Sequence, residues 1–297
     1  MNVRKLIAGV LAAGYCLTAL GGVQGLAAQP APAAAGEKTV QEELCQSEEF
    51  WLESEEGPVY GVLYLPMEVQ ETYPTVIISH GFGSTADVTG PVAKYLAEHG
   101  FAAYAFDFIG GSAASRSGAA DGDMSHMSVL TESAQLSEVI DQIAGQEWAE
   151  PENLFLVGQS QGGYVSAYTA AQRPEDIKAM VLEFPAFALQ DDCWERHGSI
   201  ENVPETERFM GQELGAVYSL DAMSMDIYDV IGAYTGEVLL LHGDNDRLVD
   251  ISYSEKALEV YENAELLVYE GANHGFAGDY ADQANADILA FLEERIG

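Results

Sequence analysis

A serine between two glycines is the first feature of the sequence that could do chemistry. Residues 158–162 read Gly-Gln-Ser-Gln-Gly, the G-x-S-x-G pattern in which a sharp turn from strand to helix exposes the serine hydroxyl. An apolar run at 153–157 precedes this turn, and a helix-like run at 164–171 follows it. Because the pattern stands in the context that it requires, we predict that Ser160 is a nucleophile for acyl transfer.

A serine needs a neighbouring base, and His274 is the best candidate among the six histidines. It lies in a glycine-flanked loop directly after the last predicted strand, from which it can reach Ser160. His99 is expected to interact with the end of a helix. His126 and His197 are expected to be surface residues, with His197 near the substrate if the insert that carries it covers the site.

The acid that orients the base is predicted to be Asp246. The apolar run at 239–241 leads into a turn with two nearby carboxylates, Asp244 and Asp246. The chain order Ser, Asp, His is that of α/β hydrolases. Asp246 lies further beyond the strand, whereas Asp244 is better placed to brace the turn by accepting backbone N–H groups. Asp250 is the third choice.

The oxyanion of an acyl-transfer reaction also needs hydrogen-bond donors. Residues 79–83 read Ser-His-Gly-Phe-Gly and directly follow a predicted strand, where such folds place one donor. We predict that this donor is the backbone N–H of Phe82. The second is the N–H of Gln161, the residue after the nucleophile, and His80 braces the loop.

Strand-like and helix-like segments alternate along the chain, which indicates an α/β fold with a mostly parallel twisted sheet flanked by helices. The strands are predicted at 59–65, 75–79, 101–108, 153–157, 179–184, 237–241 and 266–269, and the helices at 91–99, 131–143, 164–171 and 284–296. The pattern breaks at about 185–236. We interpret this stretch as a small cap insert over the carboxyl edge of the sheet, where open α/β sheets bind ligands.

The charge of the chain narrows the range of partners. Its 297 residues include 48 Asp and Glu against 12 Lys and Arg, a formal net charge of −36. Such a field repels nucleic acid and anionic membranes and disfavours strongly anionic substrates. No cysteine spacing resembles a zinc site. We therefore expect a small-molecule substrate, no nucleic-acid partner, and no metal or organic cofactor.

The N-terminus resembles an export segment. Arg4 and Lys5 precede an uncharged apolar run, and small residues suited to cleavage follow. We predict a signal peptide at 1–28, a flexible linker at 29–44 and one domain at 45–297, in a protein that is secreted or held in the cell envelope. A lipidated Cys16 would need a small residue directly before it. Tyr15 stands there instead, so we do not expect lipidation. A disulfide between the other two cysteines, Cys45 and Cys193, remains open at this stage.

With these motifs together, the chain resembles bacterial α/β-hydrolase esterases, most closely the cinnamoyl (feruloyl) esterase group. The resemblance rests on five stretches: HGFG at 80–83, FDFIGGS at 106–112, GQSQGG at 158–163, HGDND at 242–246 and ANHGF at 272–276. It implies a serine esterase, with hydroxycinnamoyl esters among the substrates. Gln159 stands where the group usually has His or Tyr, a departure that is tolerable because this side chain does no chemistry. The cap residues cannot be matched to the group's aromatic-binding residues, so the substrate stays open.

The expected reaction is two-step acyl transfer to Ser160 and then to water, with His274 as the base and then the acid. A peptidase or thioesterase on the same fold would keep these residues. A dehalogenase or epoxide hydrolase would carry Asp at position 160. An inactive binding module is the non-enzyme alternative, but such modules typically lose one of the three residues, and here all three have candidates in order.

Overall fold

A computed structural model describes residues 44–118 and 123–297. The predicted signal peptide and all but the last residue of the predicted linker lie outside these ranges. None of the helices within these ranges is both long and apolar enough to cross a membrane.

The centre of the fold is an eight-stranded sheet in the order β1-β4-β6-β5-β7-β8-β11-β12. β1 and β4 pair antiparallel to their neighbours, and the pairs from β6 to β12 are parallel. The strands are β1 (Cys45–Glu49), β4 (Gly61–Pro66), β5 (Tyr73–Ser79), β6 (Ala102–Phe106), β7 (Ala149–Gln159), β8 (Ala179–Glu183), β11 (Glu237–Gly243) and β12 (Ala264–Tyr269). The predicted α/β-hydrolase fold with a mostly parallel sheet is confirmed.

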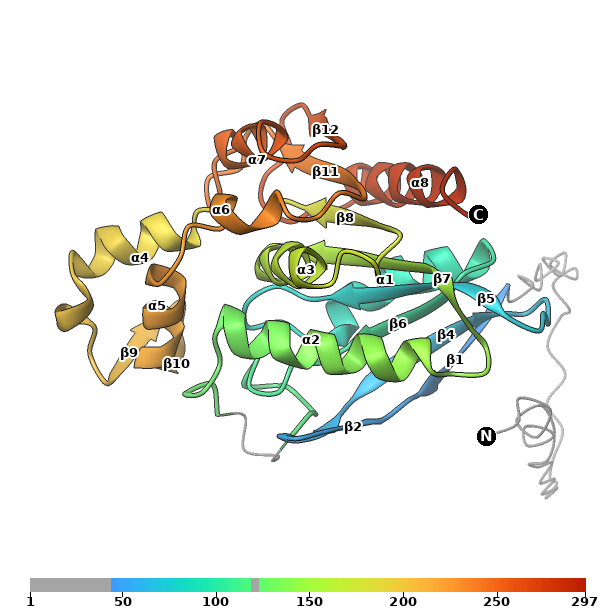
Figure 1. Cartoon of the computed structure of the whole chain (residues 1–297), viewed down its shortest axis with the longest axis horizontal. Helices are drawn as coiled ribbons and strands as arrows, with labels where there is room; N and C mark the ends of the chain where they lie inside the picture. The colour runs from blue at the N-terminus through green and yellow to red at the C-terminus, as the bar shows by residue number, and fades with distance from the viewer. Residues whose placement is uncertain (1–43, 119–122) are drawn as a thin grey trace, which may run out of the picture. The chain divides into compact units, whose positions relative to one another are not determined.

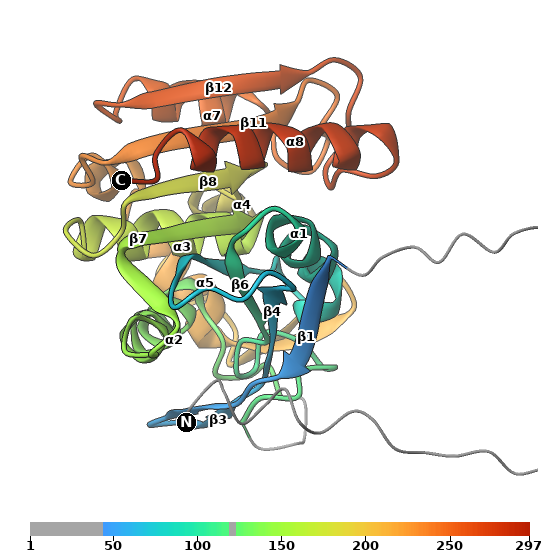
Figure 2. The same ribbon diagram turned by 90° about the vertical axis from the view of Figure 1, so that its right-hand side faces the viewer.

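Helices cover both faces of this sheet (Figures 1 and 2). α1 (Ala86–Glu98) and α8 (Asp279–Glu293) contact each other on one face, while α2 (Val129–Ala144) and α3 (Gln161–Gln172) pack together on the other. Alternate strand residues such as Val76, Ile78, Phe155 and Val157 are fully buried beneath α1 and α8. This burial on both faces explains why the central strands are continuous apolar runs.

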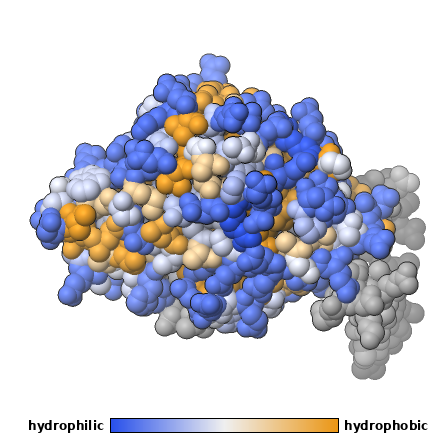
Figure 3. Space-filling view, in the orientation of Figure 1, coloured by the Kyte–Doolittle hydropathy of each residue, from blue (hydrophilic) through white to orange (hydrophobic). Residues whose placement is uncertain are grey.

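Most of the chain between β8 and β11 forms a separate group of short elements beside the sheet (Figure 1). They are α4 (Leu189–His197), a 3₁₀ turn (Ile200–Asn202), the β9 (Thr206–Phe209) and β10 (Gln212–Gly215) hairpin and α5 (Ala216–Met223). The short α6 (Tyr228–Ile231) contacts α3 instead. Hydrophobic surface gathers over this group of short elements, at the left of Figure 3. Its exposed hydrophobic residues are Trp194, Ile200 and Met210. We call residues 185–236 the cap. The remaining elements are the β2 (Leu52–Ser54) and β3 (Gly57–Val59) hairpin and α7 (Ser252–Leu258).

The first helix begins earlier than the sequence predicts. It begins at Ala86 instead of near Pro91, so the proline lies inside it. The side chain of Thr85 makes no capping hydrogen bond there. Instead the N–H of Ala86 donates to Asp107 Oδ1 at 2.7 Å, from the loop after β6. Because the carboxylate that caps this helix lies 21 positions away in the chain, the local sequence does not show where the helix begins.

Candidate active site

Ser160 occupies a strained turn between β7 and α3. Its φ of 53° and ψ of −116° place a non-glycine residue in a region that L side chains rarely adopt. The turn requires close backbone approach on both sides. A Cβ on Gly158 would lie 2.4 Å from the carbonyl oxygen of Gly162, and one on Gly162 would lie 2.4 Å from the carbonyl oxygen of Ser79. Both glycines are therefore required for this geometry.

The structure brings together the three residues predicted as nucleophile, base and acid. Ser160 Oγ lies 2.9 Å from His274 Nε2, and His274 Nδ1 lies 2.7 Å from Asp246 Oδ2. A carboxylate only accepts hydrogen bonds, so Nδ1 carries the hydrogen and Nε2 is free to accept from the serine hydroxyl. The side chains come from the loops after β7, β11 and β12, which meet at the carboxyl edge of the sheet.

Asp246 is held in place by further donors. Its Oδ1 accepts the backbone N–H groups of Leu248 at 2.8 Å and Val249 at 3.0 Å. Asp244 accepts the N–H of Gly271 at 2.6 Å and so braces the turn, as its position predicted. Asp250 accepts the N–H of the first residue of α7. Neither of these two carboxylates contacts His274, so Asp246 is the one of the three candidates that is placed to orient the histidine.

The two predicted oxyanion donors face the nucleophile from neighbouring loops. Gln161 is the first residue of α3, and the first N–H groups of a helix lack intrahelical partners. Across residues 44–118 and 123–297, the backbone N–H of Phe82 has no hydrogen-bond partner. The loop approaches Ser160 closely, because a Cβ on Gly81 would lie 3.1 Å from the Cβ of Ser160. Both N–H groups are thus available to a ligand.

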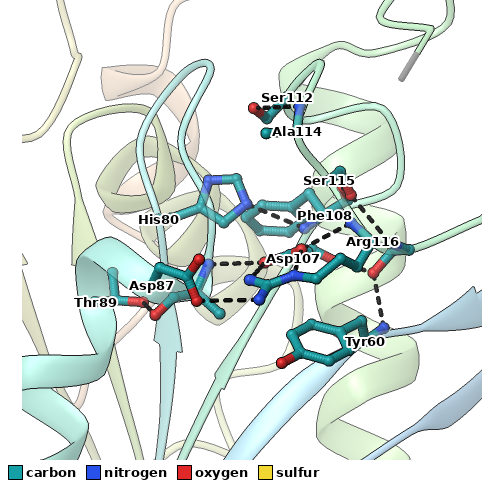
Figure 4. A network of polar contacts seen from close by, with 12 residues as sticks. Tyr60, His80, Asp87, Thr89, Asp107, Phe108, Ser112, Ala114, Ser115 and Arg116 are labelled. Atoms are coloured by element: carbon teal, nitrogen blue, oxygen red, sulfur yellow. Dashed lines mark hydrogen bonds and ion pairs between the residues drawn. The ribbon is translucent and has the colours of Figure 1, made fainter. Parts of the chain in front are cut away.

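The loop that carries Phe82 is fastened by the loop after β6 (Figure 4). The buried His80 accepts the N–H of Phe108 at Nε2, at 3.1 Å, and donates from Nδ1 to the carbonyl of Gly81 at 2.8 Å. Burial lowers the pKa of His80, so it stays neutral and acts as a brace, as predicted. Asp107 accepts from Ala86 and pairs with Arg116 at 3.0 Å, which anchors the end of the loop.

A cavity of about 440 Å³ opens above Ser160 and His274. Its wall is mostly apolar, and five aromatic residues from the sheet loops and the cap line it: Phe82, Phe184, Phe209, Tyr218 and Phe276. Glu183 and Asp192 supply acidic groups. Across the described part of the chain, no lysine or arginine lines this cavity. Its chemistry suits an uncharged, apolar acyl or alcohol group.

Two buried carboxyl groups near the nucleophile were missed by the sequence-based reasoning. Glu183 is 2% exposed, accepts from Gln159 Nε2 at 2.8 Å, and has a pKa that burial raises to about 7. Glu132 is 1% exposed, accepts from Gln161 Nε2 at 2.8 Å, and has a pKa that burial raises to about 8. The sequence did hold a signal for the burial of Glu132. This residue lies four residues before Leu136, and so on the apolar face of the predicted helix.

Of the three remaining histidine predictions, those for His99 and His126 are confirmed and that for His197 is not. His99 Nδ1 donates to the carbonyl of Tyr95 at 2.7 Å near the end of α1, and His126 is exposed. The prediction that His197 is a surface residue is wrong. Its side chain is only 7% exposed, because the packing of α4 on α5 places it 3.1 Å from Ser219 Oγ. It does not line the cavity in the described structure.

Comparison with known proteins places this geometry in a family. A family model described as serine aminopeptidase, S33, matches residues 70–219, just over half of the chain. The non-heme haloperoxidase of Rhodococcus erythropolis is 42% identical over 69 residues, which span 23% of this chain and 25% of that protein. The monoacylglycerol lipase of Mycolicibacterium smegmatis is 24% identical over 231 residues, covering 67% of this chain and 80% of the lipase.

Solved structures share the fold. Est1E from Butyrivibrio proteoclasticus, in a solved structure with ferulic acid bound, superposes with a TM-score of 0.75 and 23% identity, covering 83% of this chain and 98% of Est1E. At this identity the likeness concerns the fold alone. The matches to the non-heme haloperoxidase and to the non-heme chloroperoxidase CPO-A1 of Kitasatospora aureofaciens span only 25% and 30% of those proteins.

Proposed function

The chain belongs to the serine aminopeptidase S33 family of α/β hydrolases, and from that premise we propose that it cleaves carboxylic esters through an acyl-enzyme on Ser160. The observation that carries the proposal is the hydrogen-bonded series from Ser160 through His274 to Asp246, at 2.9 and 2.7 Å. This arrangement lets an imidazole take the serine proton while a carboxylate stabilises the imidazolium that forms.

In the proposed reaction, Ser160 Oγ attacks the ester carbonyl as its proton passes to His274 Nε2. The N–H groups of Phe82 and Gln161 donate to the oxyanion of the tetrahedral intermediate. His274 then protonates the leaving alcohol, and the acyl-enzyme forms. Water, deprotonated by His274, releases the acid and restores the serine.

The cavity supports an ester with an uncharged aromatic or otherwise apolar group. The rings of Phe82 and Phe209 have centroids 5.6 Å apart, and those of Phe184 and Phe276 are 4.9 Å apart. Aromatic faces and edges of this kind pack well against a planar acyl group. The ferulic acid bound to Est1E and the motif resemblance make hydroxycinnamoyl esters the first candidates.

An aminopeptidase is the second candidate. The family description names that activity, and Asp192 lines the cavity, where a carboxylate could bind the α-ammonium group of a peptide. A thioesterase would use the same acyl-enzyme chemistry.

The test is a hydrolysis panel on the protein and on Ser160→Ala. It contains short and long p-nitrophenyl esters, methyl ferulate, a thioester and an aminoacyl p-nitroanilide. We expect ester hydrolysis that disappears in Ser160→Ala. Turnover of the anilide alone would favour the aminopeptidase, and ester hydrolysis that persists in Ser160→Ala would refute the proposed nucleophile.

A further inference from the structure

A line of three buried polar side chains runs from α2 through the start of α3 to the cap. Glu132 Oε2 accepts from Gln161 Nε2 at 2.8 Å, and Gln161 Oε1 accepts from the hydroxyl of Tyr218 at 3.3 Å. The three residues are 1%, 2% and 2% exposed. The proposed reaction uses none of these side chains, and burying a carboxyl group is costly unless it is hydrogen-bonded.

This line touches both oxyanion donors. Gln161 supplies one of the two proposed N–H groups from its backbone, and its side chain is the middle member of the line. Phe82 supplies the other, and its ring centroid lies 5.5 Å from that of Tyr218. Tyr218 therefore contacts one donor residue through a hydrogen bond and the other through a ring contact. The three side chains thus contact both residues that supply the proposed oxyanion donors.

We infer that Glu132 is a positioning residue, which fixes Gln161 and Tyr218 and thereby the two oxyanion donors, and that its ionisation weakens catalysis. The inference rests on the proposed function and adds a regulatory group to that same site. In its neutral form Glu132 holds the Gln161 amide without placing a charge beneath the oxyanion. In its ionised form it adds a negative charge close to the place where the transition state develops one.

The surroundings of Glu132 explain why this ionisation falls in an accessible range. Burial raises its pKa to about 8, opposed only by the Gln161 hydrogen bond. The titratable groups that face it are His80, whose pKa burial lowers, and Tyr218, whose pKa burial raises. Asp221 accepts the hydroxyl of the α2 N-cap, and Glu56 accepts a glutamine amide one turn further along α2. None of these facing groups is a cation that would offset the carboxylate.

The size of the effect follows from Coulomb's law. In an effective dielectric near 20, a like charge roughly 10 Å from the oxyanion raises the barrier enough to slow the reaction by a factor on the order of ten. Because kcat/KM reports the ionisation of the free enzyme, its pH profile should fall above the pKa of Glu132. Glu183, whose pKa burial raises to about 7, is present in every variant compared below, so its ionisation does not distinguish them.

The experiment compares kcat/KM for an uncharged ester from about pH 6 to about pH 10 in the wild type, Glu132→Gln and Glu138→Gln. The glutamine at 132 keeps an acceptor for Gln161 but cannot ionise. Glu138 lies on the same helix and contacts the β2–β3 turn instead, so it controls for the chemical change. We expect the wild type and Glu138→Gln to lose about tenfold at alkaline pH, while Glu132→Gln keeps its plateau. An alkaline fall in Glu132→Gln equal to that of the wild type would overturn the inference.

A second variant tests the cap end of the line. Tyr218→Phe removes the donor to Gln161 and keeps the ring, so we expect kcat to fall about threefold to tenfold with little change in KM. Tyr261→Phe is the matched control, because the Tyr261 hydroxyl is buried without a hydrogen-bond partner in the described structure. Equal kinetics in the two phenylalanine variants would contradict the positioning role, even if Glu132→Gln failed to fold.

The two proposals fail in different ways. Persistent ester hydrolysis in Ser160→Ala would refute the proposed function. Hydrolysis that depends on Ser160 but has the same alkaline fall with and without Glu132 would refute the inference alone. If the substrate is not an ester, the rate of Ser160 labelling by a fluorophosphonate replaces kcat/KM, and the same difference between the wild type and Glu132→Gln is expected.

Discussion

The buried carboxyl group of Glu183 should make the stability of the protein depend on pH. Raising its pKa from an ordinary 4.5 to about 7 in the folded chain corresponds to about 3 kcal/mol. The folded state then binds more protons than the unfolded state between these values, so the free energy of unfolding falls as the pH rises. Roughly 2 kcal/mol of this loss should occur between about pH 5 and about pH 7.

Glu183→Gln isolates this contribution, because glutamine keeps the acceptor for Gln159 and cannot ionise. Urea unfolding at several pH values should show the variant gaining roughly 2 kcal/mol over the wild type from about pH 5 to about pH 7. Glu265→Gln, an exposed position on β12, should follow the wild type throughout. A constant difference between Glu183→Gln and the wild type would mean that the carboxyl group titrates normally in the fold, and the argument from burial would be refuted.

Three further outcomes are expected. Asp246→Asn should lower kcat/KM for esters by about 10⁴-fold, because the amide favours the wrong imidazole tautomer, whereas Asp244→Asn should cost less than tenfold in the same assay. Gly162→Ala should yield little folded protein by circular dichroism, since its Cβ would lie 2.4 Å from a β5 carbonyl oxygen. Arg116→Met should lower the free energy of unfolding by about 3 kcal/mol or more in urea titrations, because it leaves the buried Asp107 without its ion pair.

The elements that position the site could be predicted where the signal is local. The β-branched run at 75–79 favours a strand by itself. The glycines around Ser160 permit the sharp turn because they have no side chain. The chain order of Ser160, Asp246 and His274 predicts which three loops meet at the active site. Parallel strands end at one edge of the sheet, so loops distant in sequence converge there.

The rest depends on contacts between distant residues. The start of α1 is set by Asp107 in another loop, and the β9–β10 hairpin forms from charged segments with no alternating apolar pattern. Gln159 appeared chemically inert in the sequence, but its amide satisfies Glu183. A glutamate is ordinarily expected at the surface, so the burial of Glu183 emerges only when α3 and β8 pack together, whereas that of Glu132 had only the helical period of α2 to indicate it.

The most direct test of the proposed mechanism is to locate the nucleophile. The wild type, Ser160→Ala and His274→Ala would be treated with a fluorophosphonate, and the adduct located by peptide mass spectrometry. We expect a single adduct on Ser160 in the wild type, none in Ser160→Ala, and much slower labelling in His274→Ala. An adduct on a different residue, or equal labelling of Ser160→Ala, would contradict the proposed mechanism.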